Sequence, residues 1–136
     1  MPDNVPPPVT PPIPPPSTDA QARTWNMWCH MSALSGLLVP FGNILGPLVV
    51  WQMKKQEFPS VEAHAKAAMN FQITIAIAAV AIIVVGFILS FFCIGFLFFL
   101  LLPVVGLASI IFAIIAGMKA NDGVEYKYPY SLALIK

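Results

Sequence analysis

The sequence predicts an all-α integral membrane protein built on a long hairpin of two transmembrane helices. Residues 67–118 contain no Asp, Glu, Lys or Arg and are mostly aliphatic or aromatic. A helix of that length would be roughly 80 Å long, whereas the hydrocarbon core of a bilayer is only ~30 Å thick. The composition agrees, because 58% of the residues are hydrophobic and 10% are charged. The run therefore predicts two spans joined by a turn.

The first 22 residues form a proline-rich arm that holds nine of the fourteen prolines. Proline fixes φ and lacks an amide donor, so we expect the arm to be disordered and polyproline-like. The spacing of Pro8 and Pro11 fits a ligand of proline-binding modules, but it arises in any proline-rich tract. We interpret residues 1–22 as a tether and residues 23–136 as one helical membrane domain.

Residues 25–53 form a broken N-terminal membrane segment. Pro40, Gly42, Asn43 and Pro47 fall near its centre, and a proline inside a helix removes a hydrogen bond and clashes with the preceding turn. We expect two half-helices joined by a non-helical link over residues 40–43, with Gly42 free to take left-handed backbone. Because hydrocarbon cannot satisfy irregular backbone, this link should pack against the hairpin, with Asn43 bonded to protein or water.

Two arrangements of this broken segment are open. As one kinked span, it would place Trp25 and Trp28 at one membrane face and Trp51 at the other, since tryptophan anchors at interfaces. As a re-entrant pair, it would place all three at the same face. Each half is too short to span alone, which favours the re-entrant form. The side of the N-terminus depends on this choice.

The hairpin helices are expected to span the membrane over about residues 70–92 and 96–118. The first should begin after Ser60, a suitable N-cap with Glu62 in the first turn. The second should kink at Pro103 and end near Asn121. Beyond it, Tyr126 to Tyr130 predicts a strap at the membrane interface, where tyrosine is enriched.

Small residues recur at every fourth position on both hairpin helices, a spacing that lets helices approach closely in membranes. We expect these faces to pack against each other, with Ser109 at the level of Ala78. The residues on the first helix are Thr74, Ala78, Gly86 and Ser90, and those on the second are Ser109, Ala113 and Gly117.

The lysines predict the orientation. Six of them flank the hairpin, and the turn near residues 92–95 carries no charge; they are Lys54, Lys55, Lys66, Lys119, Lys127 and Lys136. Cytoplasmic loops collect Lys and Arg. We therefore expect a multi-pass protein of the cell membrane whose C-terminus is cytoplasmic.

Few side chains could carry chemistry. His30 is the only ionisable residue within an apolar run, apart from the cysteines; it could bind a headgroup or a proton, but we interpret it as an interfacial histidine bonded to a neighbour. Asn70 and Gln72 mark the entry of the first span and should bond the free backbone groups of the broken segment. We find no catalytic, metal-binding or cofactor motif, and a net charge of +1 offers no surface for nucleic acid. The protein is therefore expected not to be an enzyme.

Four segments carry a resemblance to a known family: residues 28–34, 40–47, 62–72 and 119–129. They resemble a prokaryotic membrane family of unknown function that is described as similar to the chloroplast inner-envelope import component Tic-twenty. The resemblance implies a small helical inner-membrane protein without a known reaction. By analogy only, it suggests a channel-like or translocation-associated role.

Two functions follow from these observations. The first is a non-enzymatic scaffold or interaction protein, whose partners are the lipid bilayer and either further copies of the chain or other membrane proteins. The alternative is an oligomeric channel-like or translocation-associated subunit.

Overall fold

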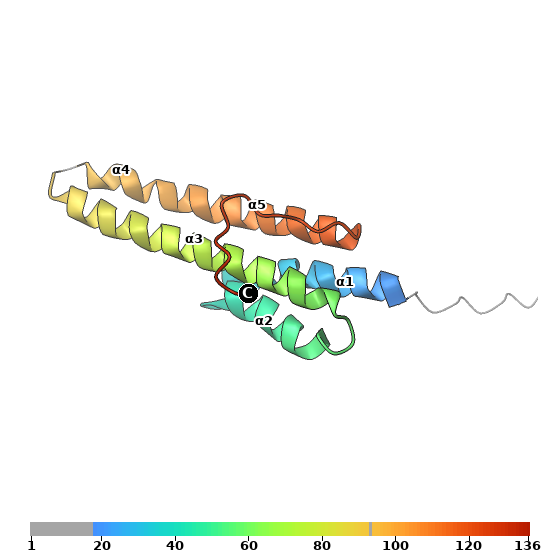
Figure 1. Ribbon diagram of the computed structural model, residues 1–136. Helices are drawn as coiled ribbons and strands as arrows, with labels where there is room; N and C mark the ends of the chain where they lie inside the picture. The colour runs from blue at the N-terminus through green and yellow to red at the C-terminus, as the bar shows by residue number, and fades with distance from the viewer. Residues whose placement is uncertain (1–17, 93) are drawn as a thin grey trace, which may run out of the picture.

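A computed structural model describes residues 18–92 and 94–136, and all its regular elements are helical. In order they are α1 (Thr18–Met31), the 3-10 helix η1 (Ser32–Leu37), α2 (Gly42–Lys54), α3 (Ser60–Ser90), α4 (Gly95–Phe99) and α5 (Leu101–Asn121). α3 and the α4–α5 pair form a long antiparallel hairpin, and α1 and α2 lie beside one half of it (Figure 1). The predicted all-α class and the helical hairpin are confirmed. α1 begins at Thr18, inside the predicted arm, and the rest of that arm lies outside the described residues.

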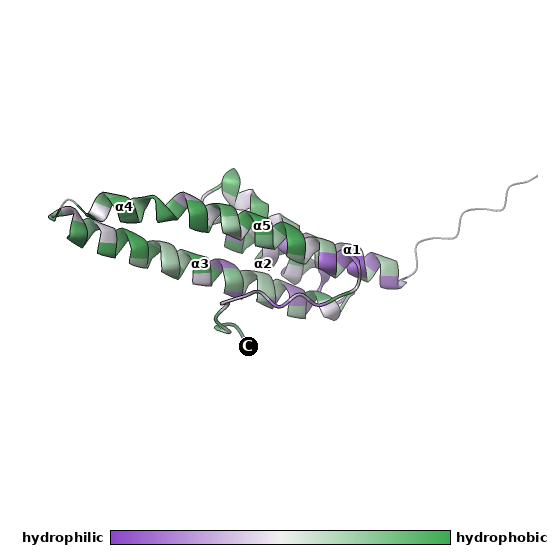
Figure 2. Cartoon of the chain, turned by 90° about the horizontal axis from the view of Figure 1, so that it is seen from above, coloured by the Kyte–Doolittle hydropathy of each residue, from purple (hydrophilic) through white to green (hydrophobic). Residues whose placement is uncertain are grey.

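The bundle has an apolar half and a polar half. Beside the turn, the hairpin stands alone and is hydrophobic on all sides, whereas polar residues gather around α1, α2 and the C-terminal tail, residues 122–136 (Figure 2). We call this polar half the base. Two stretches are long and apolar enough to span a membrane, Ser60–Ser90 and Gly95–Asn121. The chain is thus a small membrane protein with two candidate spans.

The length of α3 locates the membrane boundary. From Phe92 back to Gln72, a helix rises by roughly 30 Å, which equals the thickness of the hydrocarbon core. With the turn at one edge of that core, the other edge falls near Gln72. The base then lies largely at the level of the headgroups.

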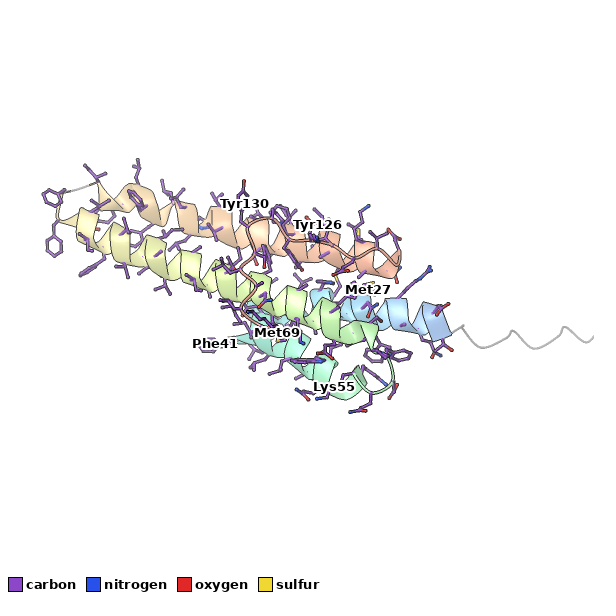
Figure 3. The ribbon with its side chains drawn as sticks, viewed as in Figure 1. Met27, Phe41, Lys55, Met69, Tyr126 and Tyr130 are labelled. Carbon is purple, nitrogen blue, oxygen red and sulfur yellow. The ribbon has the colours of Figure 1, made fainter. Side chains whose placement is uncertain are left out.

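The broken segment turns back on itself. The ammonium group of Lys54, at the end of α2, lies 4.7 Å from the ring centroid of Trp25 in α1, so both ends of the segment meet in the base. The tip is exposed, with Leu38 and Phe41 at 88% and 76% accessibility. Phe41 and Lys55 accordingly lie at opposite ends of α2 (Figure 3). The segment is thus a helical hairpin, the shape that the re-entrant arrangement requires.

The details of the break differ from the prediction. The left-handed residue is Phe41, with φ of 61°, rather than Gly42, and Gly42 and Asn43 already belong to α2. Pro40 lies in the turn. Pro47 is fully buried within α2, where its missing donor costs one hydrogen bond without ending the helix.

Gly42 and Gly46 allow close packing of α2 on η1 rather than an unusual backbone conformation. A Cβ on Gly42 would lie 2.6 Å from the carbonyl carbon of Ser35, and a Cβ on Gly46 would collide with the carbonyl oxygen of Ser32. The hydroxyl oxygen of Ser35 lies 2.7 Å from both the Ser32 and the Gly42 carbonyl oxygens, and its single proton is donated to one or the other. The four-residue glycine spacing therefore lets α2 pack directly on the backbone of η1.

The second hairpin helix is interrupted at Leu100, between α4 and α5. Pro103, in the first turn of α5, cannot donate to the carbonyl four residues earlier. The break therefore precedes the proline instead of centring on it. At the start of α3, Ser60 is not the predicted cap, because its hydroxyl lies 3.1 Å from Asn26 Oδ1 and donates to it.

The small residues pack differently from the prediction. A Cβ on Gly117 would collide with Met31 of α1, whereas Gly86 faces Phe98 and Phe99. Ser109 bonds Gln72 rather than lying at the level of Ala78. The small face of α5 thus admits α1 as well as α3.

We expect Gly46→Ala to lower the free energy of unfolding by about 1–3 kcal/mol, because the new methyl group meets backbone that cannot move aside alone. Gly106→Ala is the matched control, since nothing lies within 4 Å of a Cβ at Gly106. This control should be neutral or stabilising by up to about 1 kcal/mol. Thermal unfolding in detergent measures both, and equal stability of the two variants would contradict the η1–α2 contact.

Candidate functional site

Three side chains from distant parts of the chain meet in the interior of the base. His30 of α1 is 0% exposed. Its Nδ1 atom lies 2.8 Å from the hydroxyl of Tyr128 in the tail, and its Nε2 atom lies 3.1 Å from Nδ1 of His64 in α3. These contacts connect α1, α3 and the tail through one histidine.

The hydrogen bonds that join Tyr128, His30 and His64 fit one direction of donation. Within residues 18–92 and 94–136, the hydroxyl of Tyr128 has His30 as its hydrogen-bond partner and no other. The phenol proton is therefore used only if it points at Nδ1 of His30. His30 then carries its proton on Nε2 and donates to His64. The proton of His64 lies on its own Nε2, at the end of this series of hydrogen bonds.

Burial keeps His30, at the centre of the cluster, neutral. Loss of hydration lowers the pKa of His30 from 6.5 to about 3, with a smaller contribution from the charge of His64. Burial also raises the pKa of Tyr128 above its ordinary value. The neighbouring Cys29 has its pKa raised to about 12 by burial, so its thiol is an unreactive apolar group. The cluster is built to hold segments together rather than to exchange protons at neutral pH.

The C-terminal tail is attached to α3 by further contacts. The ring of Tyr128 stacks on Phe71 at a centroid distance of 4.1 Å. The amide nitrogen of Asn70 donates to the Ile135 carbonyl at 3.0 Å, and its oxygen accepts from the amides of Leu134 and Ile135 at 3.1 and 2.7 Å. Within the predicted interfacial strap, Tyr128 is buried against the protein, whereas Tyr130 is exposed.

A second polar contact lies near the membrane boundary. Gln72 Oε1 accepts from Asn43 Nδ2 of α2 and from the hydroxyl of Ser109 of α5, each at 3.1 Å. Asn43 is thus satisfied by protein, as expected of the broken segment. Asn70 was expected to bond that segment as well, but it holds the tail instead.

A pocket of about 270 Å³ opens beside Gln72, between η1, α3 and α5. It is mainly apolar, with Asn43, Gln72 and Ser109 as its polar members. Ala113, from the predicted small face, lies in its wall and is fully buried. In the described part of the chain, no three His, Cys, Asp or Glu residues gather closely enough to hold a metal ion. Cys93 lies outside that part.

A family model matches residues 21–135, and its family is described as the magnetosome magnetite crystal formation protein family. The chain belongs to this family. The match covers nearly all of the described structure, including every residue of the cluster of His30, His64 and Tyr128. No curated protein and no solved structure matches the chain.

Membership of the magnetosome magnetite crystal formation family corrects the resemblance to the Tic-twenty-like family. That resemblance depended on four short segments, whereas the family match extends over the whole helical domain.

Sequence reasoning found His30 in this magnetosome-family chain but not its partners. Tyr128 lies 98 positions away and His64 lies 34 positions away. Tyr128 was assigned to the interface by its residue type, and His64 was given no role by the sequence. A buried histidine needs a partner on each ring nitrogen, so the imidazole of His64 and the three tyrosine hydroxyls of the tail were the available candidates.

We expect Tyr128→Phe to destabilise the protein by about 1–3 kcal/mol, because it leaves a buried ring nitrogen of His30 without its partner. Tyr130→Phe is the control, since Tyr130 is 96% exposed and should be neutral. Thermal unfolding combined with limited proteolysis of the tail measures the effect. A tail that is equally protected in both variants would argue against the role of the hydroxyl.

The protein should also lose stability in mild acid. Because the folded pKa of His30, about 3, lies below the ordinary value of 6.5, the unfolded chain gains a proton that the folded chain excludes between these values. The contribution of His30 to the free energy of unfolding is therefore constant above pH 6.5, and it falls as the pH drops from 6.5 towards 3. His30→Gln should show a smaller drop in melting temperature between about pH 7 and pH 5. An equal drop would show that other groups cause the acid sensitivity.

Proposed function

We propose that this protein is a non-enzymatic scaffold of the magnetosome membrane that contributes to magnetite crystal formation. Family membership over residues 21–135 and the two candidate spans support the place and the process. The observation that carries the scaffold role is the distribution of charge. Every charged side chain of the described structure belongs to the base or its loops, and residues 67–118 contain none.

This distribution bears on how the protein could affect a crystal. Iron and other hard cations are bound by carboxylates and similar oxygen donors. The hairpin turn, at residues 91–94, offers no carboxylate, so direct contact between the turn and the mineral finds no support. The base carries acidic and basic groups and is the part suited to bind partner proteins. Those partners are either further copies of this chain or other membrane proteins, in addition to the lipid bilayer.

The lysines support one orientation. Lys54, Lys55 and Lys66 belong to the same end of the bundle as Lys119 and Lys127, and such clusters are retained on the cytoplasmic side. We propose that the base and the C-terminus face the cytoplasm. The hairpin turn then faces the interior of the magnetosome.

The channel-like alternative has less support. Beyond the base, the described hairpin consists of two helices, and large apolar side chains such as Val84, Phe87 and Val104 are exposed on it. An apolar two-helix hairpin is suited to contact lipid rather than to enclose a polar pathway. The neutral His30 cluster, which is occupied by its own hydrogen bonds, likewise favours a non-catalytic role.

The orientation can be measured on isolated, intact magnetosomes with a membrane-impermeant maleimide, in a background in which Cys93 is replaced by Ser. A cysteine introduced at Lys127 should react, and one introduced at Ile94 should react only after detergent is added. Cys29 is buried and should give no background. Protection at Lys127 with reaction at Ile94 would reverse the proposed orientation.

Crystal formation itself tests the scaffold role. Deletion of the gene should alter the size, number or shape of magnetite crystals in electron micrographs, and the wild-type chain should restore them. The purified protein should be silent in planar bilayers. Unchanged crystals after deletion would overturn the role in crystal formation, and steady ion conductance would favour the channel-like alternative.

A further inference from the structure

The pocket beside Gln72 has an opening that the packing of the protein does not explain. Gly106 of α5 lies in its wall, and a Cβ there would meet nothing within 4 Å. Glycine inside a helix costs about 1 kcal/mol relative to alanine. Elsewhere in this chain, as at Gly42 and Gly46, glycine admits another backbone. Gly106 admits none, so what it provides is space.

The pocket also contains hydrogen-bonding capacity that the protein leaves unused. Gln72 is only 3% exposed, and both of its hydrogen-bond partners, Asn43 and Ser109, bond its carbonyl oxygen. Across residues 18–92 and 94–136, its amide nitrogen has no partner. That nitrogen is not sealed in the protein either, because the one fully enclosed unpaired polar side-chain atom in this part is Trp51 Nε1. The amide donor of Gln72 is thus available to a molecule in the pocket.

The depth of the pocket restricts what that molecule can be. Gln72 lies at the edge of the hydrocarbon core, and Lys66 lies about 9 Å further towards the headgroups by helix rise. In a phospholipid, ester carbonyls lie at this same edge, the charged headgroup lies outside it, and the acyl chain runs inward. The apolar wall formed by Leu37, Ile75 and Ile110 lies where a chain would run.

We propose that this pocket binds one phospholipid, with an acyl chain between η1, α3 and α5 and an ester carbonyl that accepts a hydrogen bond from the amide nitrogen of Gln72. An unpaired amide at the edge of hydrocarbon is costly, and a lipid carbonyl removes that cost. Gly106 provides the opening through which the chain enters. This site requires only that the hairpin spans a bilayer.

The test uses the full chain, reconstituted in vesicles of phosphatidylethanolamine and phosphatidylglycerol that contain a trace of a diester phospholipid with a photoactivatable acyl chain. After irradiation, labelled residues are mapped by mass spectrometry. We expect labels at Leu37, Ile75 and Ile110. Gly106→Phe should fill the pocket and reduce this labelling at least about fivefold, a loss of roughly 1 kcal/mol of binding by the logarithmic relation of affinity to free energy.

Val104→Phe is the matched control, because Val104 is exposed on the same helix and lies outside the pocket lining. It should label like the wild type. A diether analogue of the probe, which lacks the ester carbonyl, should label these three positions several-fold less than the diester. Melting temperatures of both variants must match the wild type, and Gly106→Leu replaces Gly106→Phe if the larger side chain unfolds the protein.

Two results would overturn the proposal. Equal labelling in Gly106→Phe and Val104→Phe would show that the label reports general lipid contact. Efficient disulfide formation between two copies, each with a cysteine introduced at Ile110, would show that a second copy of the chain occupies the pocket instead.

Discussion

Hydrocarbon accepts and donates no hydrogen bonds, and the placement of every irregular segment in this protein follows from that constraint. The start of α2 and the C-terminal tail both lie against α3 near residues 70–74. Where they approach the apolar half, an amide side chain meets them. Gln72 serves the broken segment and Asn70 serves the tail. Beyond these residues α3 is helical up to the turn, and the second hairpin helix is interrupted at Leu100, so most of this backbone satisfies itself.

His30 stabilises the base by joining segments that are distant in the sequence. Its two ring nitrogens join α1 to α3 and to the tail, so the base closes only when segments from the two ends of the described chain have met. The hairpin needs no such meeting, since α3 and α5 are neighbours in sequence. The protein therefore combines a locally determined membrane anchor with a base whose packing depends on distant contacts. Contacts of long sequence separation are the ones that order a chain late.

The sequence predicted the hairpin and the break in the first segment because both depend on local properties, namely apolar length and the helix-breaking effect of proline. It did not predict what the glycines do. Gly42 was expected to supply left-handed backbone, yet Phe41 takes that conformation while Gly42 admits the backbone of η1. Nor could it predict the pairing of His30 with Tyr128, because a donor and an acceptor 98 positions apart share no periodicity. Features set by neighbouring residues could thus be predicted from the sequence, whereas contacts between distant residues could not.

The folded-back first segment gives the molecule unequal width along the hairpin. Near the base, α1, η1 and α2 add to the hairpin, whereas near the turn the hairpin stands alone (Figure 1). The exposed Leu38 and Phe41 lie at the tip of this extra volume, and in a bilayer that the hairpin spans they would enter one leaflet only. Inserting volume into one leaflet favours bending towards that side, as it does for other wedge-like membrane insertions. With the base on the cytoplasmic face, many copies would suit the strongly curved wall of a small vesicle better than a flat membrane.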